Sequence, residues 1–199
     1  MTAAADSRVV VGDFSHGELD GWSSKVFDGV TRYTLVTDNA RQVLKAESSN
    51  AASGLFKRTR IDLTKTPYLH WSWKVLGTLG NIDEHTKAGD DYPARVYVVF
   101  SGGVLFWRTR AVNYVWSSNQ PRESTWQNAF TGNAGMIALR GGGEETGRWV
   151  HERRDVRSDY RRLFGGDVRY VDSVAIMTDT DNTHKSAVAY YGDIYFSSE

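Results

Sequence analysis

Short stretches of alternating or β-branched residues recur along the whole chain. Glycine, asparagine, aspartate and proline separate these stretches, as expected for strands that are joined by turns. A chain with this many strands is typical of two packed sheets or of a barrel. The predicted strands are Arg8–Phe14, Arg32–Thr37, Gln42–Ala46, Gly54–Leu63, Tyr68–Leu76, Ala94–Ser101, Ala111–Trp116, Ala134–Leu139, Trp149–Val156, Tyr170–Thr178 and Ala187–Phe196.

One stretch, Val156–Phe164, has the spacing of a helix instead. Val156, Tyr160 and Leu163 fall on one helical face. Asp155 precedes the stretch and can serve as its N-cap, and two glycines follow its last turn. The sequence therefore predicts a single short helix among the strands.

Nothing in the chain marks a domain boundary, because it has no internal repeat, no linker composition and no block of like charge. Its length of 199 residues is close to the size of about 200–250 residues that one sandwich or barrel reaches. A hydrophobic fraction of 40% is sufficient for a sizeable core. We therefore predict one all-β domain over residues 1–199, a two-sheet β-sandwich with one short helix, in which residues 1–7 are flexible.

The composition excludes several classes of partner. Basic and acidic residues number 24 each, so the net charge is zero and nothing points to nucleic acid or to an anionic membrane surface. No apolar run of about 18 residues is present, so we expect no membrane insertion. Cysteine is absent, which excludes disulfides, thiolate nucleophiles and thiolate metal ligands. These data leave the oligomeric state open.

Two predicted strands each have one apolar and one polar face. Along Tyr68–Leu76, alternation places Lys74 on the face opposite the tryptophans. Along Ala94–Ser101, it places Arg95 and Tyr97 opposite an apolar face. If these strands are neighbours, the three polar side chains share a surface. That surface is either a solvated outer face or a platform that binds a ligand through ring and polar contacts.

The connection between these two strands, Gly77–Pro93, is longer than a hairpin needs, and long ordered loops are frequently functional. It carries His85, Asp90 and Asp91, whose imidazole and carboxylate groups could ligate a metal or act as acid and base. A solvated loop is the alternative interpretation. We predict that Asp90 and Asp91 lie at the rim of a ligand site.

Trp116 and Arg154 are two further candidates for this site. The strand Ala111–Trp116 places Asn113 on one face and Tyr114 with Trp116 on the other, and neither face is plainly the core. Arg154 belongs to a stretch in which arginines and carboxylates are interleaved, a pattern that is also typical of a solvated, ion-paired surface.

The oxygen-rich segment Thr178–Thr183 follows an apolar strand and has features of a Ca²⁺ loop. Asp179 and Asp181 fit the first and third positions of an EF-hand loop. His184 stands where the invariant glycine belongs, and Tyr190 stands where the bidentate glutamate belongs. An Asx-type turn is therefore an equally good interpretation.

Familiar catalytic signatures are missing from the chain. It contains no G-x-S-x-G elbow, no P-loop and no dinucleotide fingerprint. The sequence therefore contains no motif that indicates a hydrolase, an NTPase or a dehydrogenase. We expect no required cofactor.

Ordered motifs are spread over nearly the whole chain: Trp71–Val75, Gly89–Phe100, Tyr114–Trp116, Arg154–Val156, Asp159–Tyr160, Phe164–Gly165, Thr178–Thr183 and Tyr191–Ile194. In this order they resemble a bacterial family catalogued as domain of unknown function 3047. Members of that family mostly look exported. The start of the chain lacks the apolar run of a signal peptide, and we expect it to be a mature end. The resemblance thus implies a periplasmic or secreted protein.

More distantly, the first and last predicted strands are similar to those of galactose-binding-like jelly rolls, the fold of many carbohydrate-binding modules. This similarity implies a jelly-roll-like sandwich, and saccharide binding follows from it only by analogy. In such modules a structural Ca²⁺ often lies near the paired terminal strands, which would involve Asp13 and Asp193 here. With Asp179 of the oxygen-rich loop, these are the candidate metal ligands.

The leading hypothesis is a non-catalytic domain that binds a saccharide or another polar small molecule on a sheet face. The first alternative is a hydrolase or lyase of envelope glycans that uses Asp90 or Asp91 with Arg95. The second is a structural or partner-binding envelope protein, which predicts a broad exposed apolar patch. The predicted ligand-binding residues are Lys74, Asp90, Asp91, Arg95, Tyr97, Trp116, Arg154 and Asp181.

Overall fold

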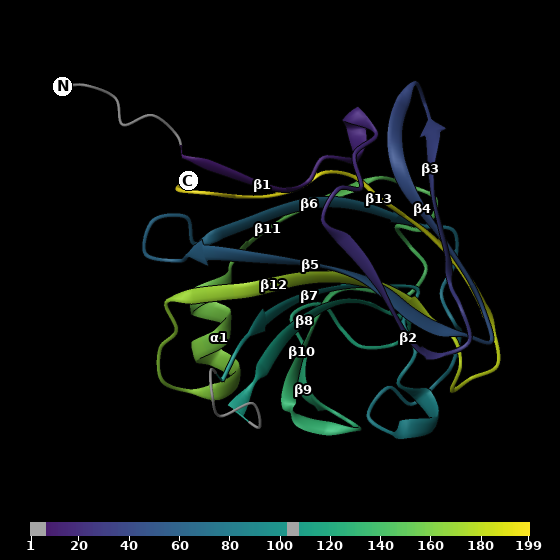
Figure 1. Cartoon of the computed structure of the whole chain (residues 1–199). Coiled ribbons are helices and arrows are strands. Elements are labelled where there is room, and N and C mark those ends of the chain that lie inside the picture. Colours follow the sequence, from purple (N-terminus) through teal and green to yellow (C-terminus); the bar gives the residue numbers. More distant parts are fainter. Residues whose placement is uncertain (1–6, 103–107) are drawn as a thin grey trace.

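Two seven-stranded sheets pack face to face in the computed structural model, which describes residues 7–102 and 108–199 (Figure 1). One α-helix is found in these residues, α1 at Val156–Phe164. The predicted all-β, jelly-roll-like sandwich with one short helix is therefore confirmed. The predicted flexible start lies outside the described residues except for Ser7.

Sheet A is antiparallel throughout its described pairs. Its order is β1-β14-β6-β13-β4-β3, and β11 pairs with the other edge of β6. β13 and β14 pair with successive parts of the same edge of β6, so the chain runs once along β6 with a break at Gly192 and Asp193. The strands of sheet A are β1 (Arg8–Gly12), β3 (Arg32–Asp38), β4 (Arg41–Ser49), β6 (Tyr68–Val75), β11 (Val150–Asp155), β13 (Ser186–Tyr191) and β14 (Ile194–Ser197).

Sheet B has the order β2-β5-β12-β7-β8-β10-β9. All of its described pairs are antiparallel except β8 with β10, which are parallel because the short strand β9 reverses the chain between them. The strands of sheet B are β2 (Trp22–Asp28), β5 (Ala52–Asp62), β7 (Ala94–Phe100), β8 (Arg110–Ser117), β9 (Thr125–Asn128), β10 (Thr131–Gly141) and β12 (Tyr170–Asp179).

The main core lies between the sheets and is built from the apolar face of each strand. Trp71 and Trp73 of β6 meet Tyr114 and Trp116 of β8 there, with the rings of Trp73 and Trp116 5.8 Å apart. Burial of such large side chains is the main favourable term in folding. The prediction that Trp116 lies at the rim of a ligand site is therefore wrong, because this ring is fully buried between the sheets.

The strands β6 and β7 belong to different sheets, so the prediction that Lys74 shares a surface with Arg95 and Tyr97 is also wrong. The long connection between them crosses from sheet A to sheet B. Lys74 lies on the outer face of sheet A, where its Nζ donates to Asp38 at 2.6 Å and lies 4.3 Å from the ring of Tyr190. Alternation identified the outward face of each strand correctly but not its sheet.

The sequence predicted the helix correctly but missed the two edge strands of sheet B. Asp155 caps α1 by accepting from the amide of Ser158, as predicted, and Gly165 ends it. The strands β2 and β9 were not predicted, and the last predicted strand is divided at Gly192 and Asp193 into β13 and β14. β2 is exposed along almost its whole length and β9 has four residues, so neither shows the alternation that identifies a half-buried strand, whereas the edge strands β1 and β3 of sheet A were predicted.

The loop between β6 and β7 packs against the outer face of sheet B. Its Tyr92 joins Val115, Trp126 and Met136 in a second, smaller buried cluster. Glu84 of the same loop is fully buried and accepts from the amide of Ser118 at 2.6 Å. The loop is therefore an ordered wall beside sheet B. Among the described residues, no helix has both the length and the apolar character needed to cross a bilayer.

Candidate functional site

A groove runs over the outer face of sheet B. One hollow of about 330 Å³ is lined both by Phe27 of β2 and by Phe130 and Thr131 near the start of β10. Because β2 and the β9–β10 hairpin lie at opposite edges of the sheet, the sheet must be concave on this side. A second hollow of about 440 Å³ shares Phe27, Tyr97 and Met177 with the first. The two hollows adjoin at these shared residues, and we call them together the sheet B groove.

Arg95 of β7 lies at the floor of the sheet B groove and is almost completely buried. Its Nε donates to Asp179 Oδ1 at 2.8 Å, and its Nη2 donates to Asp179 Oδ2 and, at 2.6 Å, to the main-chain oxygen of Asp90. The guanidinium carbon lies 4.3 Å from the centroid of the Tyr92 ring. Burial of a guanidinium is costly unless its donors are satisfied, so these partners hold Arg95 in one position.

Four carboxyl groups surround this one guanidinium: those of Asp90, Asp91, Asp179 and Asp181. Oxygens of Asp91, Asp179 and Asp181 lie within 4.8 Å of one another. Burial raises the pKa of Asp179 to about 7 against the lowering effect of Arg95, and the charges of Asp91 and Asp90 raise it further. Burial and the charge of Asp91 also raise the pKa of Asp181. This end of the groove can therefore hold a proton near neutral pH, and it can then donate hydrogen bonds as well as accept them.

Three buried oxygen atoms in the groove have no hydrogen-bond partner among the described residues: Oδ1 of Asn113, of Asp90 and of Asp181. Asn113 is 1% exposed and Asp90 is 4% exposed. An unpaired buried polar group costs about 1–3 kcal/mol, so most such groups are paired in folded proteins. In a hollow, these atoms are candidate contacts for a polar ligand.

Exposed aromatic rings stand at both ends of the hollow. Phe27 is 60% exposed and Phe130 is 55% exposed, while Tyr97 forms part of the floor between them. Phe27 and Phe130 were missed in the sequence because an isolated ring on an edge strand or in a turn gives no periodic signal. Asn113 could have been found, since the burial of Tyr114 and Trp116 on one face sends it to the other.

Of the predicted ligand-binding residues, Asp90, Arg95, Tyr97 and Asp181 line the groove together. Asp91 lies behind it, where its carboxylate accepts from the amides of Asn182 and Thr183 and from both of their side chains. It therefore fixes the turn that carries Asp181. The placement of each residue is observed, and ligand binding by them remains a prediction.

Arg154 is not part of the groove. It lies on β11 of sheet A, where its Nε donates to Asp159 of α1 at 2.9 Å and its Nη1 donates to Glu123 at 2.7 Å. The prediction that it contributes to the same site as Arg95 is wrong, because its partners tie it to the helix end of the sandwich. The ion-paired alternative describes it correctly.

Of the three predicted metal ligands, Asp13 and Asp193 lie close together, since Ser15 Oγ is within hydrogen-bonding distance of both, at 3.4 and 2.6 Å, and Asp179 lies apart from them. Both carboxylate oxygens of Asp193 accept from Ser15, and Asp13 Oδ1 lies 2.6 Å from the His16 ring. Asp179 lies in the sheet B groove instead, paired with Arg95. Asp179 therefore does not share a site with Asp13 and Asp193, and a structural Ca²⁺ at the terminal strands remains a prediction.

The oxygens of Asp91, Asp179 and Asp181 are a different carboxylate group that lies close enough to share a cation. Asp91 and Asp179 already accept hydrogen bonds from Asn182, Thr183 and Arg95. A cation at this position would compete with these protein donors.

Comparison with known families supports the resemblance noted in the motifs. The family model described as protein of unknown function, DUF3047, matches residues 20–195. The chain belongs to this family. A search of curated proteins found no match. The family assignment defines relatives of the chain and leaves their function open.

Solved structures show the same fold in distant proteins. The chain is similar to the family 30 carbohydrate-binding module of the cellulosomal cellulase Cel9D-Cel44B of Clostridium thermocellum, with a TM-score of 0.55, 14% identity, and coverage of 98% of this chain and 99% of that chain. It is also similar to the cellulose induced protein Cip1, with a TM-score of 0.55, 8% identity, and coverage of 94% and 96%. At such low identity these similarities establish the sandwich fold alone.

Proposed function

We propose that this DUF3047 protein binds a saccharide in the sheet B groove without transforming it. The observation that carries the proposal is the combination of exposed rings at both ends of a concave face with unpaired, buried polar atoms on its floor. Such binding requires no cofactor. The periplasm or the extracellular space is the location that we propose for it, as the family resemblance implies.

The chemistry of the groove fits a sugar ring. The C–H faces of a pyranose pack on aromatic rings such as Tyr97 and Phe130, and its hydroxyl groups both donate and accept hydrogen bonds. Asn113 and Asp90 provide unpaired acceptors, and Arg95 holds Asp90 and Asp179 in position. Ligand sites with few, preorganised polar groups in an otherwise apolar hollow are the usual arrangement for small molecules. The distant likeness to carbohydrate-binding modules agrees with this proposal by analogy.

A glycan array followed by isothermal titration with the oligosaccharides that bind tests this proposal. We expect Asn113→Ala and Phe130→Ala each to weaken binding by roughly 3- to 10-fold, because each removes one hydrogen-bonding or ring contact. Leu76→Ala is the matched control, since Leu76 is 54% exposed, as Phe130 is 55% exposed, but lies outside the groove. Binding that is unchanged by the two groove variants, or an absence of binding to any saccharide, would contradict the proposal.

Cleavage of a glycan in the same groove is the second candidate, and one observation favours it. Asp179 and Asp181 both line the hollow with oxygens within 4.8 Å, and the pKa of Asp179 is raised to about 7. Retaining glycosidases place two carboxyl groups about 5–5.5 Å apart, and a catalytic pKa near the working pH is favourable. Release of reducing ends from a bound oligosaccharide, lost in Asp181→Asn, would establish this activity. Binding with no such release would leave the non-catalytic proposal standing.

A further inference from the structure

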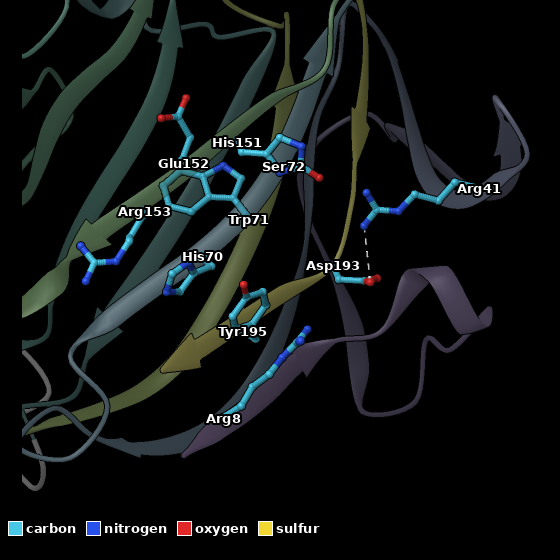
Figure 2. A pocket seen from close by; sticks show the side chains of 10 residues that line it. All are labelled: Arg8, Arg41, His70, Trp71, Ser72, His151, Glu152, Arg153, Asp193 and Tyr195. Atoms are coloured by element: carbon cyan, nitrogen blue, oxygen red, sulfur yellow. Dashed lines mark hydrogen bonds and ion pairs between the residues drawn. The ribbon is translucent and has the colours of Figure 1, made fainter. Parts of the chain in front are cut away.

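A third hollow, of about 380 Å³, opens on the outer face of sheet A, on the opposite side of the sandwich from the sheet B groove (Figure 2). It lies near the break between β13 and β14, where the neighbouring strand changes from β4 to β1. We call it the sheet A hollow. Its lining includes Arg8, Arg41, Ser72, Asp193 and Tyr195.

Positive charge exceeds negative charge at one side of this hollow. Arg8 and Arg41 point toward Asp193 from opposite sides in Figure 2, and Arg41 Nη2 lies 3.5 Å from Asp193 Oδ2. Both oxygens of Asp193 already accept from Ser15, at 2.8 and 2.6 Å. Glu152, the other acid in the lining, accepts from Arg140 at 2.7 Å. Of the three arginines in the lining, Arg41 contacts Asp193, whereas Arg8 and Arg153 form no ion pair among the described residues, so positive charge is in excess here.

Arg8 is held in place without the use of its N–H donors. Its guanidinium carbon lies 3.6 Å from the centroid of the Tyr195 ring. On the strand beside it, Tyr195 stacks on His70 with centroids 4.6 Å apart and an angle of 1° between the rings. Stacking on a ring uses the face of a guanidinium and leaves its planar edge available. The donors of Arg8 therefore remain free for a ligand in the part of the chain that the structure describes.

A buried hydroxyl group completes the hollow. Ser72 of β6 is 3% exposed, and its Oγ makes no hydrogen bond within residues 7–102 and 108–199. Gly192 lies directly beside it: a Cβ at this position would overlap Ser72 Oγ and come within 3.2 Å of Arg41 Nη2. The glycine thus allows the hydroxyl and the guanidinium to approach the same point. The hydroxyl can therefore donate to a ligand in the hollow.

We propose that the sheet A hollow binds a single oxyanion group, a carboxylate, phosphate or sulfate carried by a small molecule. Arg8 and Arg41 donate to it from two sides and Ser72 donates from the floor. Guanidinium groups match the planar, two-oxygen edge of such anions, and hydrogen bonds to a charged acceptor are the stronger kind. The excess of positive charge in the lining fits an anionic ligand. This site is separate from the sheet B groove and does not depend on it.

Isothermal titration with three probes tests the proposal: glucuronate, inorganic phosphate, and glucose as the neutral counterpart of glucuronate. We expect at least one anion to bind and glucose not to bind at this hollow. Arg8→Gln and Arg41→Gln should each weaken anion binding by about 10-fold, since each removes one charged donor. Both side chains are exposed, so the variants should fold normally. Binding should also weaken as salt rises.

Two control variants separate this site from the rest of the surface. Arg60 is also an exposed arginine that lies over a tyrosine ring, 4.0 Å from the Tyr170 centroid, but it lies outside the hollow, so Arg60→Gln should bind as the wild type does. Tyr97→Ala in the sheet B groove should likewise leave anion binding unchanged. Equal affinity for phosphate and glucuronate would show that the oxyanion group alone is sufficient for binding. Tighter binding of glucuronate would show that the sugar ring also contributes to affinity. No binding of either anion, or wild-type binding by both arginine variants, would overturn the proposal.

Discussion

The two outer faces of the sandwich use arginine in opposite ways. In the sheet B groove, Arg95 is buried and its donors are satisfied by Asp179 and Asp90. In the sheet A hollow, Arg8 and Arg41 are exposed and keep donors available. Burial fixes the first guanidinium as part of the framework of the groove, whereas exposure leaves the other two able to exchange solvent for a ligand. The difference shows that residue type alone does not reveal which arginine contributes to stability and which to recognition.

Substitution of the buried arginine should have the largest effect. Arg95→Met leaves Asp179 as an unpaired buried carboxyl group, and loss of one partner of a buried pair costs about 3–5 kcal/mol. We expect the free energy of unfolding, measured by urea denaturation, to fall by that amount. Arg8→Met should change it by no more than about 0.5 kcal/mol, as is usual for a surface position. Similar losses in both variants would remove the contrast between the two faces.

The pH dependence of stability sharpens the same contrast. The pKa of Asp179 is raised from 3.8 to about 7 in the folded protein, so the native state keeps a proton that the unfolded state has lost between these values. Stability from this group is complete below about pH 4 and is lost as the pH rises through 7. The slope is at most about 1.4 kcal/mol per pH unit. Urea denaturation at pH 5 and pH 7.5 should show higher stability at pH 5, and Asp179→Asn should flatten this difference.

Substitution of Asn113 should have a smaller effect on the free energy of unfolding, and it should stabilise the protein. The buried side-chain oxygen of Asn113 has no partner within the described part of the chain, so Asn113→Leu should raise the free energy of unfolding by about 1 kcal/mol while it weakens saccharide binding. Denaturation and titration of the same variant measure the two quantities. A loss of stability would mean that the amide is paired in solution and that its role is structural.

Alternation along single strands predicted a large part of this structure. It placed Arg95 and Tyr97 on an outward face, and the capping signals at Asp155 located α1 to the residue. It could not show that β6 and β7 lie in different sheets, because the choice of a strand's partner depends on contacts between distant segments. Lys74 was therefore grouped with Arg95 although the whole thickness of the sandwich lies between their faces.

The candidate sites were predicted in part for the same reason. Asp90, Arg95, Tyr97 and Asp181 come from one loop, one strand and one turn that the sequence identified separately, and the fold brings them together. Trp116 was assigned to a ligand surface because a ring that packs in a core and a ring that faces a sugar have the same local pattern. The sheet A hollow has no local signature, since its three arginines come from β1, from the start of β4 and from β11.

The pairing of β1 with β14 has a consequence for how the chain acquires its structure. Arg8 lies opposite Ser197, and the amide of Ser15 reaches Asp193 across 178 positions of sequence. Neither strand can find its neighbour until almost the entire chain has been synthesised, and contacts of this range form slowly. The stack of Arg8 on Tyr195 should therefore be among the last interactions to form. Pulsed hydrogen exchange during refolding should show late protection of the amides in β1 and β14.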